Sequence, residues 1–497
     1  MPIKYTLLLT SLAVVGSASF THAQNEFDAA KYAKLQAGGT ARSLSIGGAA
    51  GSLGGDFSAT SVNPAGLGLY RSSELTITPT VKVNNADASY LGNSNIEEKT
   101  KFNLDNFGLV INTAAKGKQY QNSAWKSQSI AFGFNRLADF NGTSYYSGRN
   151  NNSSYSEMME AEAQNAVNQF GNLQEEDGAN GYLGYQAYVL NDNYQSVPYL
   201  NVIAQGGSLI QEKYSRNKGH ANEWTISYGA NYKEQLLLGV TLGLVDHRYE
   251  TYNTFTERDA SNDKTNGFNY FRFTQDLSTR GTGVNLKFGG IYIPTNNVRI
   301  GAAIHTPTWN TFTDIADYHI VSDMEDGNIY NVTPKNVYSY DYTLRTPWKA
   351  VLSGTVLFQD KGFLTADYEY VGYNNMRYGF TGAQDYERFI NNNIKDLYTG
   401  ASNVRVGAEA NLNPVRLRVG FSYYGSPYKN SEVMYGDRMN YSAGIGYRNN
   451  GFFMDLGYIY STGKDVEYPY LINNVDVKPG VITTNRSNIA LTLGVKF

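Results

Sequence analysis

The dominant pattern along the chain is a strict alternation of apolar residues with polar or small ones. It is clearest in the last eleven residues, "SNIALTLGVKF" (487–497), and it recurs in "EWTISYGANY" (223–232), "VRVGAEA" (404–410) and "RLRVGFSYY" (416–424). A period of two places successive side chains on opposite faces of a β-strand. The pattern therefore predicts strands with one apolar face from residue 72 to the C-terminus.

The connections between these strands alternate between tight and long. Tight polar turns are expected at 232–235, 294–297, 359–362, 411–414 and 448–451. Long polar connections are expected at 84–101, 137–221, 246–277, 306–343, 374–401, 425–437 and 462–486. A soluble sandwich also alternates, but a short–long rhythm places every second connection at the same end of the sheet, as in outer-membrane barrels. About fourteen strands fit between the connections, an even number that leaves both termini at the periplasmic end.

The predicted fold class is an all-β membrane protein. In hydrocarbon every backbone N–H and C=O must be paired, so a sheet can span only as a closed barrel. We expect an antiparallel outer-membrane β-barrel over 72–497. Helix-forming patterns at 156–170 and 385–399 fall in two of the long connections and predict external helices over the barrel mouth, either as loop packing or as ligand-handling elements.

The N-terminal region is different from the rest of the chain. Residues 1–23 have the form of a secretory signal peptide, with Lys4 before an apolar stretch at 5–15 and a cleavage pattern that ends at Ala23. Residues 24–71 are rich in Gly, Ala and Ser and lack alternation, which favours a separate plug, or hatch, inside the barrel. No later apolar run is long enough for a transmembrane helix.

Composition narrows the chemistry further. The chain contains 41 Tyr and 50 Gly, no Cys, and a formal net charge of −3. Without Cys there are no disulfides, no thiolate metal sites and no cysteine-linked lipid anchor. The near-neutral charge gives no basis for nucleic-acid binding. Tyr and Phe at strand ends suit the interfacial girdles of a membrane barrel.

No catalytic residue, cofactor or metal site is predicted. None of the five His residues is spaced to share a metal ion with another. His305 would be the candidate base of a barrel enzyme acting on lipids, but no Gly-x-Ser-x-Gly nucleophile turn accompanies it. A histidine at the barrel rim is the simpler interpretation. The glycine runs do not match a phosphate-binding loop.

Charged residues within the alternating segments fall on the face that points into the lumen. They are Lys287, Asp367, Glu369, Arg405, Glu409, Arg416, Arg418 and Asp455. Arg405, Glu409, Arg416 and Arg418 lie on adjacent predicted strands and are expected to form a ladder of ion pairs. Such a ladder would either stiffen the barrel wall or contact substrate.

One long segment, "GGTARSLSIGGAAGSLGGDFSATSVNPAGL" (38–67), resembles the N-terminal hatch of the FadL/TodX outer-membrane family, whose members transport long-chain fatty acids and other hydrophobic compounds. The segments 281–307, 346–358 and 362–376 resemble hairpins of the same family. These segments occur in the same order as in the family, and the resemblance covers essentially the whole mature chain.

The resemblance implies a fourteen-stranded barrel plugged by the hatch. It also implies passive uptake, in which external loops capture a hydrophobic ligand, a site beside the hatch receives it, and a gap at a kinked third strand releases it sideways. The residues expected to shape or gate the hatch are Gly38, Gly39, Arg42, Gly47, Gly48, Asp56, Asn63, Pro64, Ala65 and Gly66. Arg42 and Asp56 are expected to anchor the hatch to the lumen wall. A static plug is the alternative. The connection at 137–221 departs from the family pattern, so ligand-capturing residues cannot be transferred.

The same resemblance suggests partners. Phe497, at the end of an alternating strand, resembles the signal that outer-membrane proteins present to the barrel-assembly machinery. The other expected partners are a hydrophobic small molecule, outer-membrane lipid and lipopolysaccharide, and the protein is expected to be a monomer. Four alternatives remain at this point: a general diffusion porin, a lipid-modifying enzyme, a haem-type receptor, and an energised receptor with a larger plug.

Overall fold

The structure is a computed structural model that describes residues 26–36, 38–175, 179–192, 199–201, 203, 207–261, 266–472 and 475–497. The predicted signal peptide lies outside these ranges. None of the helices within them is long and apolar enough to cross a membrane.

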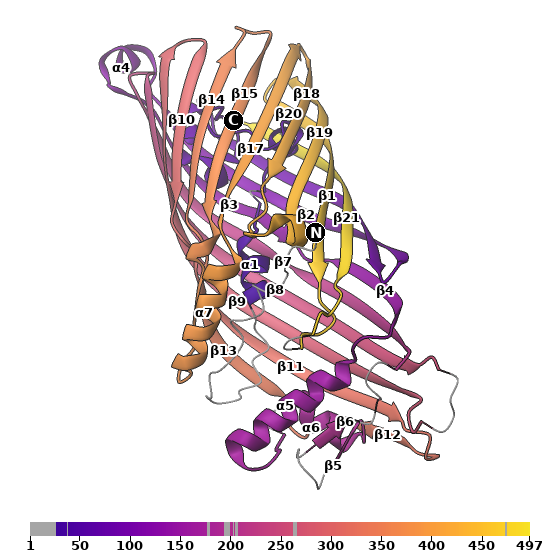
Figure 1. Ribbon diagram of the computed structural model, residues 1–497. Helices are drawn as coiled ribbons and strands as arrows, with labels where there is room; N and C mark the ends of the chain where they lie inside the picture. The colour runs from indigo at the N-terminus through magenta and orange to yellow at the C-terminus, as the bar shows by residue number, and fades with distance from the viewer. Residues whose placement is uncertain are drawn as a thin grey trace, which may run out of the picture.

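The chain forms one closed antiparallel β-barrel, in which β21 returns to pair with β1 (Figure 1). Nineteen strand segments make fourteen barrel strands, because four of the strands are interrupted: β3/β4, β10/β11, β12/β13/β14 and β15/β16. The segments are β1 (Glu74–Tyr90), β2 (Asn93–Ala114), β3 (Trp125–Asp139), β4 (Gly142–Asn150), β7 (Leu209–Tyr232), β8 (Leu236–Asp259), β9 (Tyr270–Thr295), β10 (Val298–His305), β11 (Trp309–Asp323), β12 (Ile329–Val332), β13 (Tyr338–Arg345), β14 (Lys349–Leu357), β15 (Gly362–Gly372), β16 (Arg377–Gly379), β17 (Gly400–Leu412), β18 (Val415–Tyr424), β19 (Tyr435–Asn449), β20 (Phe452–Glu467) and β21 (Gly480–Lys496).

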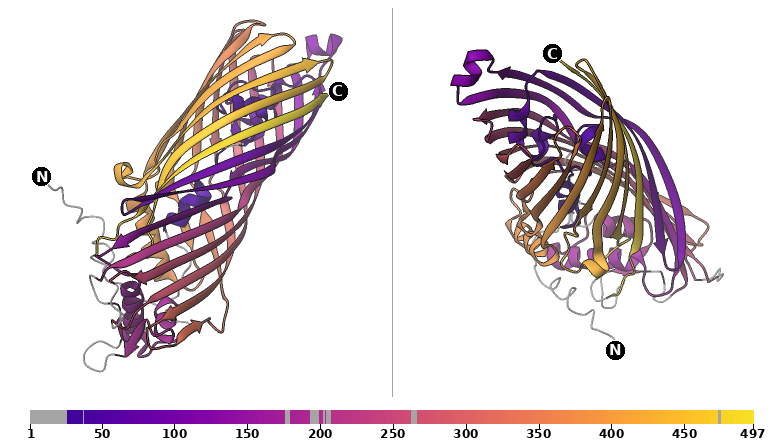
Figure 2. Two further views of the ribbon diagram at one scale, coloured as in Figure 1. Left: turned by 90° about the vertical axis from the view of Figure 1, so that its right-hand side faces the viewer. Right: turned by 90° about the horizontal axis from the view of Figure 1, so that it is seen from above.

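The remaining elements are short. Two three-residue strands, β5 (Leu190–Asp192) and β6 (Tyr199–Asn201), pair outside the barrel. The helices are α1 (Glu26–Ala33), α2 (Ala41–Ser45), α3 (Ala59–Val62), η1 (Pro64–Leu69), α4 (Gly117–Asn122), α5 (Tyr155–Phe170), α6 (Ala179–Gln186), η2 (Tyr373–Asn375), α7 (Gln384–Leu397) and α8 (Ser431–Met434). As predicted, α5 and α7 lie at the end of the barrel where the long connections gather, whereas α1, α2, α3 and η1 lie inside it (Figures 1 and 2).

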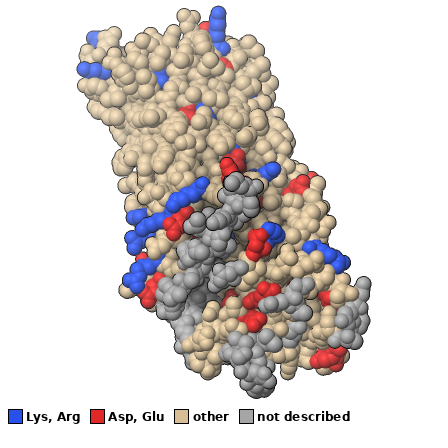
Figure 3. All heavy atoms as spheres, viewed as in Figure 1, with Lys and Arg blue, Asp and Glu red and all other residues tan. Residues whose placement is uncertain are grey.

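Alternation along the strands separates two chemical environments. Outward positions carry exposed apolar side chains, and inward positions carry buried polar ones. Examples of the outward set are Ile77, Ile130, Ile226, Leu238, Phe288, Leu352, Val419 and Leu456. On the face shown in Figure 3, charged side chains gather at one rim and in the opposite half, with a nearly uncharged band between them. A closed sheet with an apolar outer band is the architecture of an outer-membrane barrel.

The long connections are shorter than the sequence predicts, because several of their polar segments are strands. The expected loop at 84–101 is a hairpin in which only Leu91 and Gly92 turn, at φ values of 47° and 88°. Most of 246–277 belongs to β8 and β9, and much of 306–343 to β11, β12 and β13. The wall is therefore uneven: β7, β8 and β9 have 24, 24 and 26 residues, whereas β18 has ten. About 9–11 residues suffice to cross a bilayer, so the long strands project far beyond it.

This geometry predicts which sites are accessible on intact cells. An epitope inserted at Asn151, between β4 and α5, is expected to be detected by antibody without permeabilisation. The same epitope at Asn449, beside the tight β19–β20 turn, is expected to be detected only after the outer membrane is opened. Labelling at Asn449 alone would reverse the orientation of the barrel.

Candidate functional site

The N-terminal segment from Gly38 to Arg71 fills the lumen near the end of the short turns (Figure 2). Its backbone is bonded to inward side chains on opposite sides of the barrel. The Ala41 N–H donates to Thr492 Oγ1 over 2.7 Å, and the Gly51 N–H donates to Asp367 Oδ2 over 3.1 Å. Ser52 Oγ and Thr355 Oγ1 are 2.8 Å apart. The segment is therefore a hatch that is fastened to the wall by hydrogen bonds.

Asn63 is the most connected residue of the hatch. Its Oδ1 accepts from the Ala65 N–H at 3.1 Å, which closes the turn over Pro64. Its Nδ2 donates to the Gly51 carbonyl at 2.6 Å, and it lies 3.2 Å from the Gly290 carbonyl on the wall. One amide thus joins two hatch segments to the barrel.

The wall approaches the hatch through glycines at inward positions. A Cβ at Gly407 or Gly420 would lie 2.5 or 2.2 Å from backbone atoms of Ile46 and Gly47. The other wall glycines that contact the hatch are Gly108, Gly133, Gly229, Gly239, Gly289, Gly301, Gly444 and Gly457. No side chain fits at such distances, so these positions form a glycine footprint that is shaped to the hatch.

The glycines of the hatch itself serve two purposes. Gly47 and Gly48 have φ values of 68° and 75°, a region that favours glycine. Gly38 and Gly39 lie too close to Arg136 and Ser58 to carry a side chain. Gly66 packs against Gly54 and Ala59, and Ala65 is fully buried.

The two charged residues of the hatch have different roles. Arg42 Nε lies 3.5 Å from Glu409 Oε2 on β17, so Arg42 reaches the wall. Burial opposes ionisation, but Glu409 and Asp56 raise the pKa of the Arg42 guanidinium above its ordinary value. The expectation that Asp56 anchors the hatch to the wall is wrong. Its carboxylate accepts hydrogen bonds from Thr40 Oγ1 at 2.8 Å and from the Ser58 N–H at 2.9 Å, both within the hatch.

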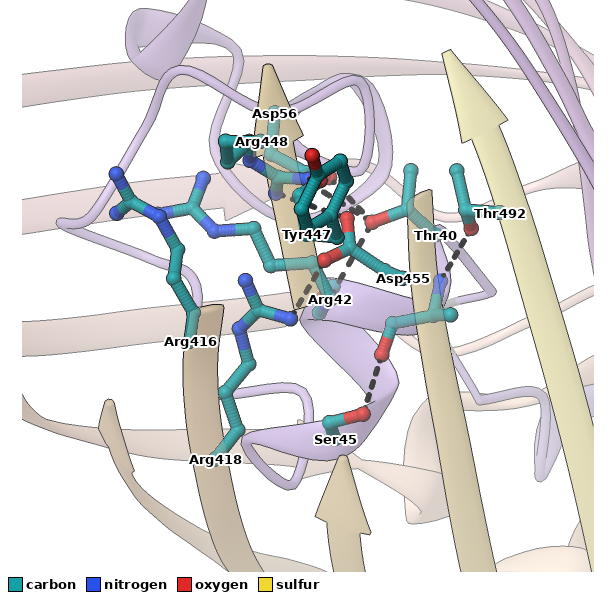
Figure 4. Close-up of polar contacts among 12 residues, drawn as sticks. Thr40, Arg42, Ser45, Asp56, Arg416, Arg418, Tyr447, Arg448, Asp455 and Thr492 are labelled. Atoms are coloured by element: carbon teal, nitrogen blue, oxygen red, sulfur yellow. Dashed lines mark hydrogen bonds and ion pairs between the residues drawn. The ribbon is translucent and has the colours of Figure 1, made fainter. Parts of the chain in front are cut away.

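A network of buried ion pairs lies beside Arg42 (Figure 4). Arg418 Nε donates to Glu409 Oε2 at 2.6 Å, and Arg418 Nη1 donates to Asp455 Oδ1 at 2.7 Å. Arg416 and Arg448 complete it at 3.0 and 2.8 Å from Glu409 and Asp455. Arg448 was not predicted, because it precedes a turn and its sequence context does not indicate which way it points.

Arg405 is not part of this network, although the sequence groups it there. It pairs instead with Glu369, at 3.3 Å, and lies 3.8 Å from Asp367. Lys287 pairs with Glu223, which was not among the predicted lumen charges. Alternation could have identified Glu223, because it begins the segment 223–232 on the face that points into the lumen.

A polar cavity of about 60 Å³ lies between residues 32–36, which precede the hatch, the hatch itself and the barrel wall. Its charged lining consists of Glu223, Lys287, Lys349, Glu369 and Arg405. Lys349 makes no salt bridge within the described ranges; its Nζ donates to the Leu35 carbonyl at 3.1 Å. His305 also lines the cavity, and its Nε2 lies 2.9 Å from the Val62 carbonyl of the hatch. The cavity therefore carries one cation more than its carboxylates.

The barrel wall has a break in its backbone pairing close to this cavity. The β2–β3 ladder ends at Asn106 and Asn135, and β2 residues 93–104 pair only with β1. Beyond the break, β3 and its continuation β4 pair only with β7. We call this break the β2–β3 seam. Leu137, at the seam, lines the cavity.

Polar side chains fill the seam. Lys82 Nζ lies 2.7 Å from Asp105 Oδ2. Asn103 Nδ2 donates to Asp139 Oδ2 over 2.6 Å, and Arg136 Nη1 donates to Asn103 Oδ1 over 2.6 Å. The wall is thus held together here by side chains, which can exchange partners without breaking a backbone ladder.

Among the described residues, no group of three or more His, Asp and Glu side chains is placed to hold a metal ion.

Comparison with known proteins places the fold. No protein-family model matches the sequence, and no curated protein matches it. Examples among the solved structures that match, each covering 93% of this chain with 99% of its own, are a FadL homologue of Pseudomonas aeruginosa (13% identity, TM-score 0.57), the toluene transporter TodX of Pseudomonas putida (12%, TM-score 0.54) and the toluene transporter TbuX of Ralstonia pickettii (15%, TM-score 0.52). The chain has the fold of the FadL/TodX outer-membrane channels, a fourteen-stranded barrel with an N-terminal segment in its lumen.

Proposed function

We propose that the protein is a passive outer-membrane channel for the uptake of hydrophobic small molecules, with long-chain fatty acids as the preferred class. The observation that carries the proposal is the β2–β3 seam beside the polar cavity. A cargo that leaves through the wall needs a place where no backbone ladder must be broken, because unpaired backbone groups in lipid cost several kcal/mol each. The toluene transporters TodX and TbuX have the same fold, which supports a hydrophobic cargo.

The position of the hatch inside the lumen makes a general diffusion porin the weaker alternative. It contacts the wall on opposite sides of the lumen, so polar solutes have no wide aqueous path. The enzyme alternative has little support from His305, because its ring faces a backbone carbonyl of the hatch and not a nucleophile.

An acidic head group is favoured by the charges of the cavity. Lys349 makes no salt bridge to a carboxylate in the described part of the chain, and Glu369, the cavity carboxylate that attracts it, is already bonded to Arg405 and Asn403. A fatty-acid carboxylate placed near Lys349 Nζ would balance the excess cation. A hydrogen bond to a charged group contributes about 1.5–3 kcal/mol.

The test is Lys349→Met, which keeps the length of the side chain and removes its charge. We expect it to lower uptake of a fluorescent long-chain fatty acid about tenfold, and to leave uptake of a neutral alkane tracer unchanged. Lys361→Met, in the short β14–β15 turn, is the matched control and should change neither. An equal loss for both tracers would contradict an acid-specific role of Lys349. If cells with and without the wild-type protein take up both tracers equally, the proposal that the protein is an uptake channel is wrong.

A further inference from the structure

Two pairs of arginines face each other across neighbouring strands on the outer surface of the barrel. Arg248 of β8 lies directly opposite Arg280 of β9, and Arg345 of β13 lies directly opposite Arg377 of β16. All four side chains are exposed. Like charges at directly opposed positions destabilise a sheet, so such pairs need an anion between or beside them.

Each pair is only half neutralised by the protein. Arg248 Nη2 lies 2.8 Å from Glu250 Oε1, and Arg377 Nη2 lies 3.4 Å from Glu387 Oε1. The side chains of the opposite members, Arg280 and Arg345, make no ion pair or hydrogen bond to any described residue. The same arrangement of one satisfied and one unsatisfied arginine thus occurs at two separate places on the wall.

The charges around the first pair leave Arg280 without a facing carboxylate. Asp246 faces His220, with 3.4 Å between His220 Nε2 and Asp246 Oδ2. Glu250 is bound by Arg248 and also lies opposite Lys218. On the other side of Arg280 lies Thr313, whose Oγ1 donates to Asp341 Oδ1. Among the described residues, no carboxylate therefore lies directly opposite Arg280.

The first pair lies where the outer surface changes from apolar to polar. Leu244 on β8 and Val284 on β9 are exposed apolar residues opposite each other, and each lies four residues from the arginine of its strand. Beyond the arginines no outward aliphatic side chain follows on these strands. At about 3.3 Å per residue and a tilt of about 40°, four residues rise about 10 Å, which reaches the head-group layer.

The second pair has a similar setting. Arg345 lies opposite Trp309 on its other side, and the Trp309 side chain is 51% exposed on the outer face. Tryptophan is enriched at the boundary between hydrocarbon and head groups. Both arginine pairs therefore lie at the outer membrane boundary.

We propose that these two arginine pairs bind the phosphate groups of a phosphorylated glycolipid in the outer leaflet. Guanidinium groups match phosphate geometry with paired hydrogen bonds. The hydrocarbon chains of such a lipid would lie along the apolar residues below each pair. A free phosphate ion would lack this second contact, and a zwitterionic phospholipid would bring its own cation.

The experiment uses the purified full-length protein in detergent. Thermal unfolding is followed while bis-phosphorylated lipid A is added; the other arms are dephosphorylated lipid A, phosphatidylethanolamine and inorganic phosphate. We expect only the phosphorylated lipid A to raise the melting temperature at micromolar concentration, and added salt to weaken the effect. In Arg280→Gln/Arg345→Gln the lipid concentration for half-maximal effect should rise at least tenfold. Arg216→Gln/Arg272→Gln removes two exposed arginines farther out and should change it less than twofold.

A charge reversal separates binding from folding. Arg280→Glu would place a carboxylate opposite Arg248, so the lipid-free barrel should melt at a higher temperature than wild type while its response to lipid A weakens. Heat-modifiable mobility confirms that each variant is assembled. An equal response of both double variants to lipid A would overturn the proposal. So would stabilisation by inorganic phosphate at the same concentration, which would indicate a free-anion site.

Discussion

Replacing Arg418 by methionine is expected to lower the free energy of unfolding by about 3–5 kcal/mol. The Arg418 side chain is fully buried, and it neutralises both Glu409 and Asp455. Methionine has no charge, so Glu409 keeps only Arg42 and Arg416, and Asp455 keeps only Arg448, all of which are more exposed than Arg418. The measurement is denaturant unfolding of the refolded barrel, followed by heat-modifiable mobility or tryptophan fluorescence.

Two further variants test this explanation. Arg416→Met removes a neighbouring cation on the same strand, but the Arg416 side chain is 31% exposed, so the loss should be below about 1 kcal/mol. In Arg418→Met/Glu409→Gln/Asp455→Asn the two buried carboxylates are neutral as well, so part of the lost stability should return; the return is incomplete because Arg42, Arg416 and Arg448 lose their acidic partners. Equal losses in Arg416→Met and Arg418→Met would show that the buried pairing is not the cause.

Locking the hatch to the wall is expected to reduce uptake at least tenfold if the hatch must move. Ser52 and Thr355 are within hydrogen-bonding distance across the hatch–wall boundary, and the chain has no other cysteine to interfere. In Ser52→Cys/Thr355→Cys an oxidised S–S bond of about 2.05 Å would replace a hydrogen bond worth about 1 kcal/mol. A covalent link exceeds any gating equilibrium of a few kcal/mol. Uptake of a fluorescent fatty acid is measured before and after reduction, in cells with equal amounts of barrel.

The matched control introduces a disulfide between two strands of the wall, away from the hatch–wall boundary. Ser227 Oγ and Thr241 Oγ1 are also 2.8 Å apart, but they join β7 to β8. Oxidation of Ser227→Cys/Thr241→Cys should change uptake less than twofold. If the hatch-locked protein transports normally in its oxidised form, the hatch is a static plug at this contact and the cargo passes it without displacing it.

Alternation predicted the barrel well wherever one face of a strand meets lipid. It failed at 84–101 and in much of 246–277, where long strands appear in place of loops. The physical reason is that period two requires one apolar face. The hairpin "NADASYLGNSNIEEKTKF" has only the short buried row Ala86, Ala88 and Tyr90 on β1, and its β2 half is mostly polar, so it carries no long apolar stripe.

The hatch was located from its composition and from its family resemblance, but its contacts were not predictable. The sequence shows which residues point into the lumen; it does not show which side chains on different strands come together. Arg405 was grouped with Arg418, yet it pairs with Glu369 on the neighbouring strand β15. Asp56 was assigned to the wall, yet the turn that carries it directs its carboxylate to Thr40.

The glycine footprint of the wall has a consequence for the order of assembly. Ile46 lies against the backbone of Gly407 and Gly420, and Pro64 lies against Gly239, with no side chain between the two surfaces. Insertion of the hatch into a barrel already closed by the β1–β21 pairing would require these two surfaces to slide past each other at such distances. We therefore expect the hatch to be in the lumen before β21 joins β1, so that the wall closes around it. Closure and plugging would then occur together, and no open pore would form during assembly.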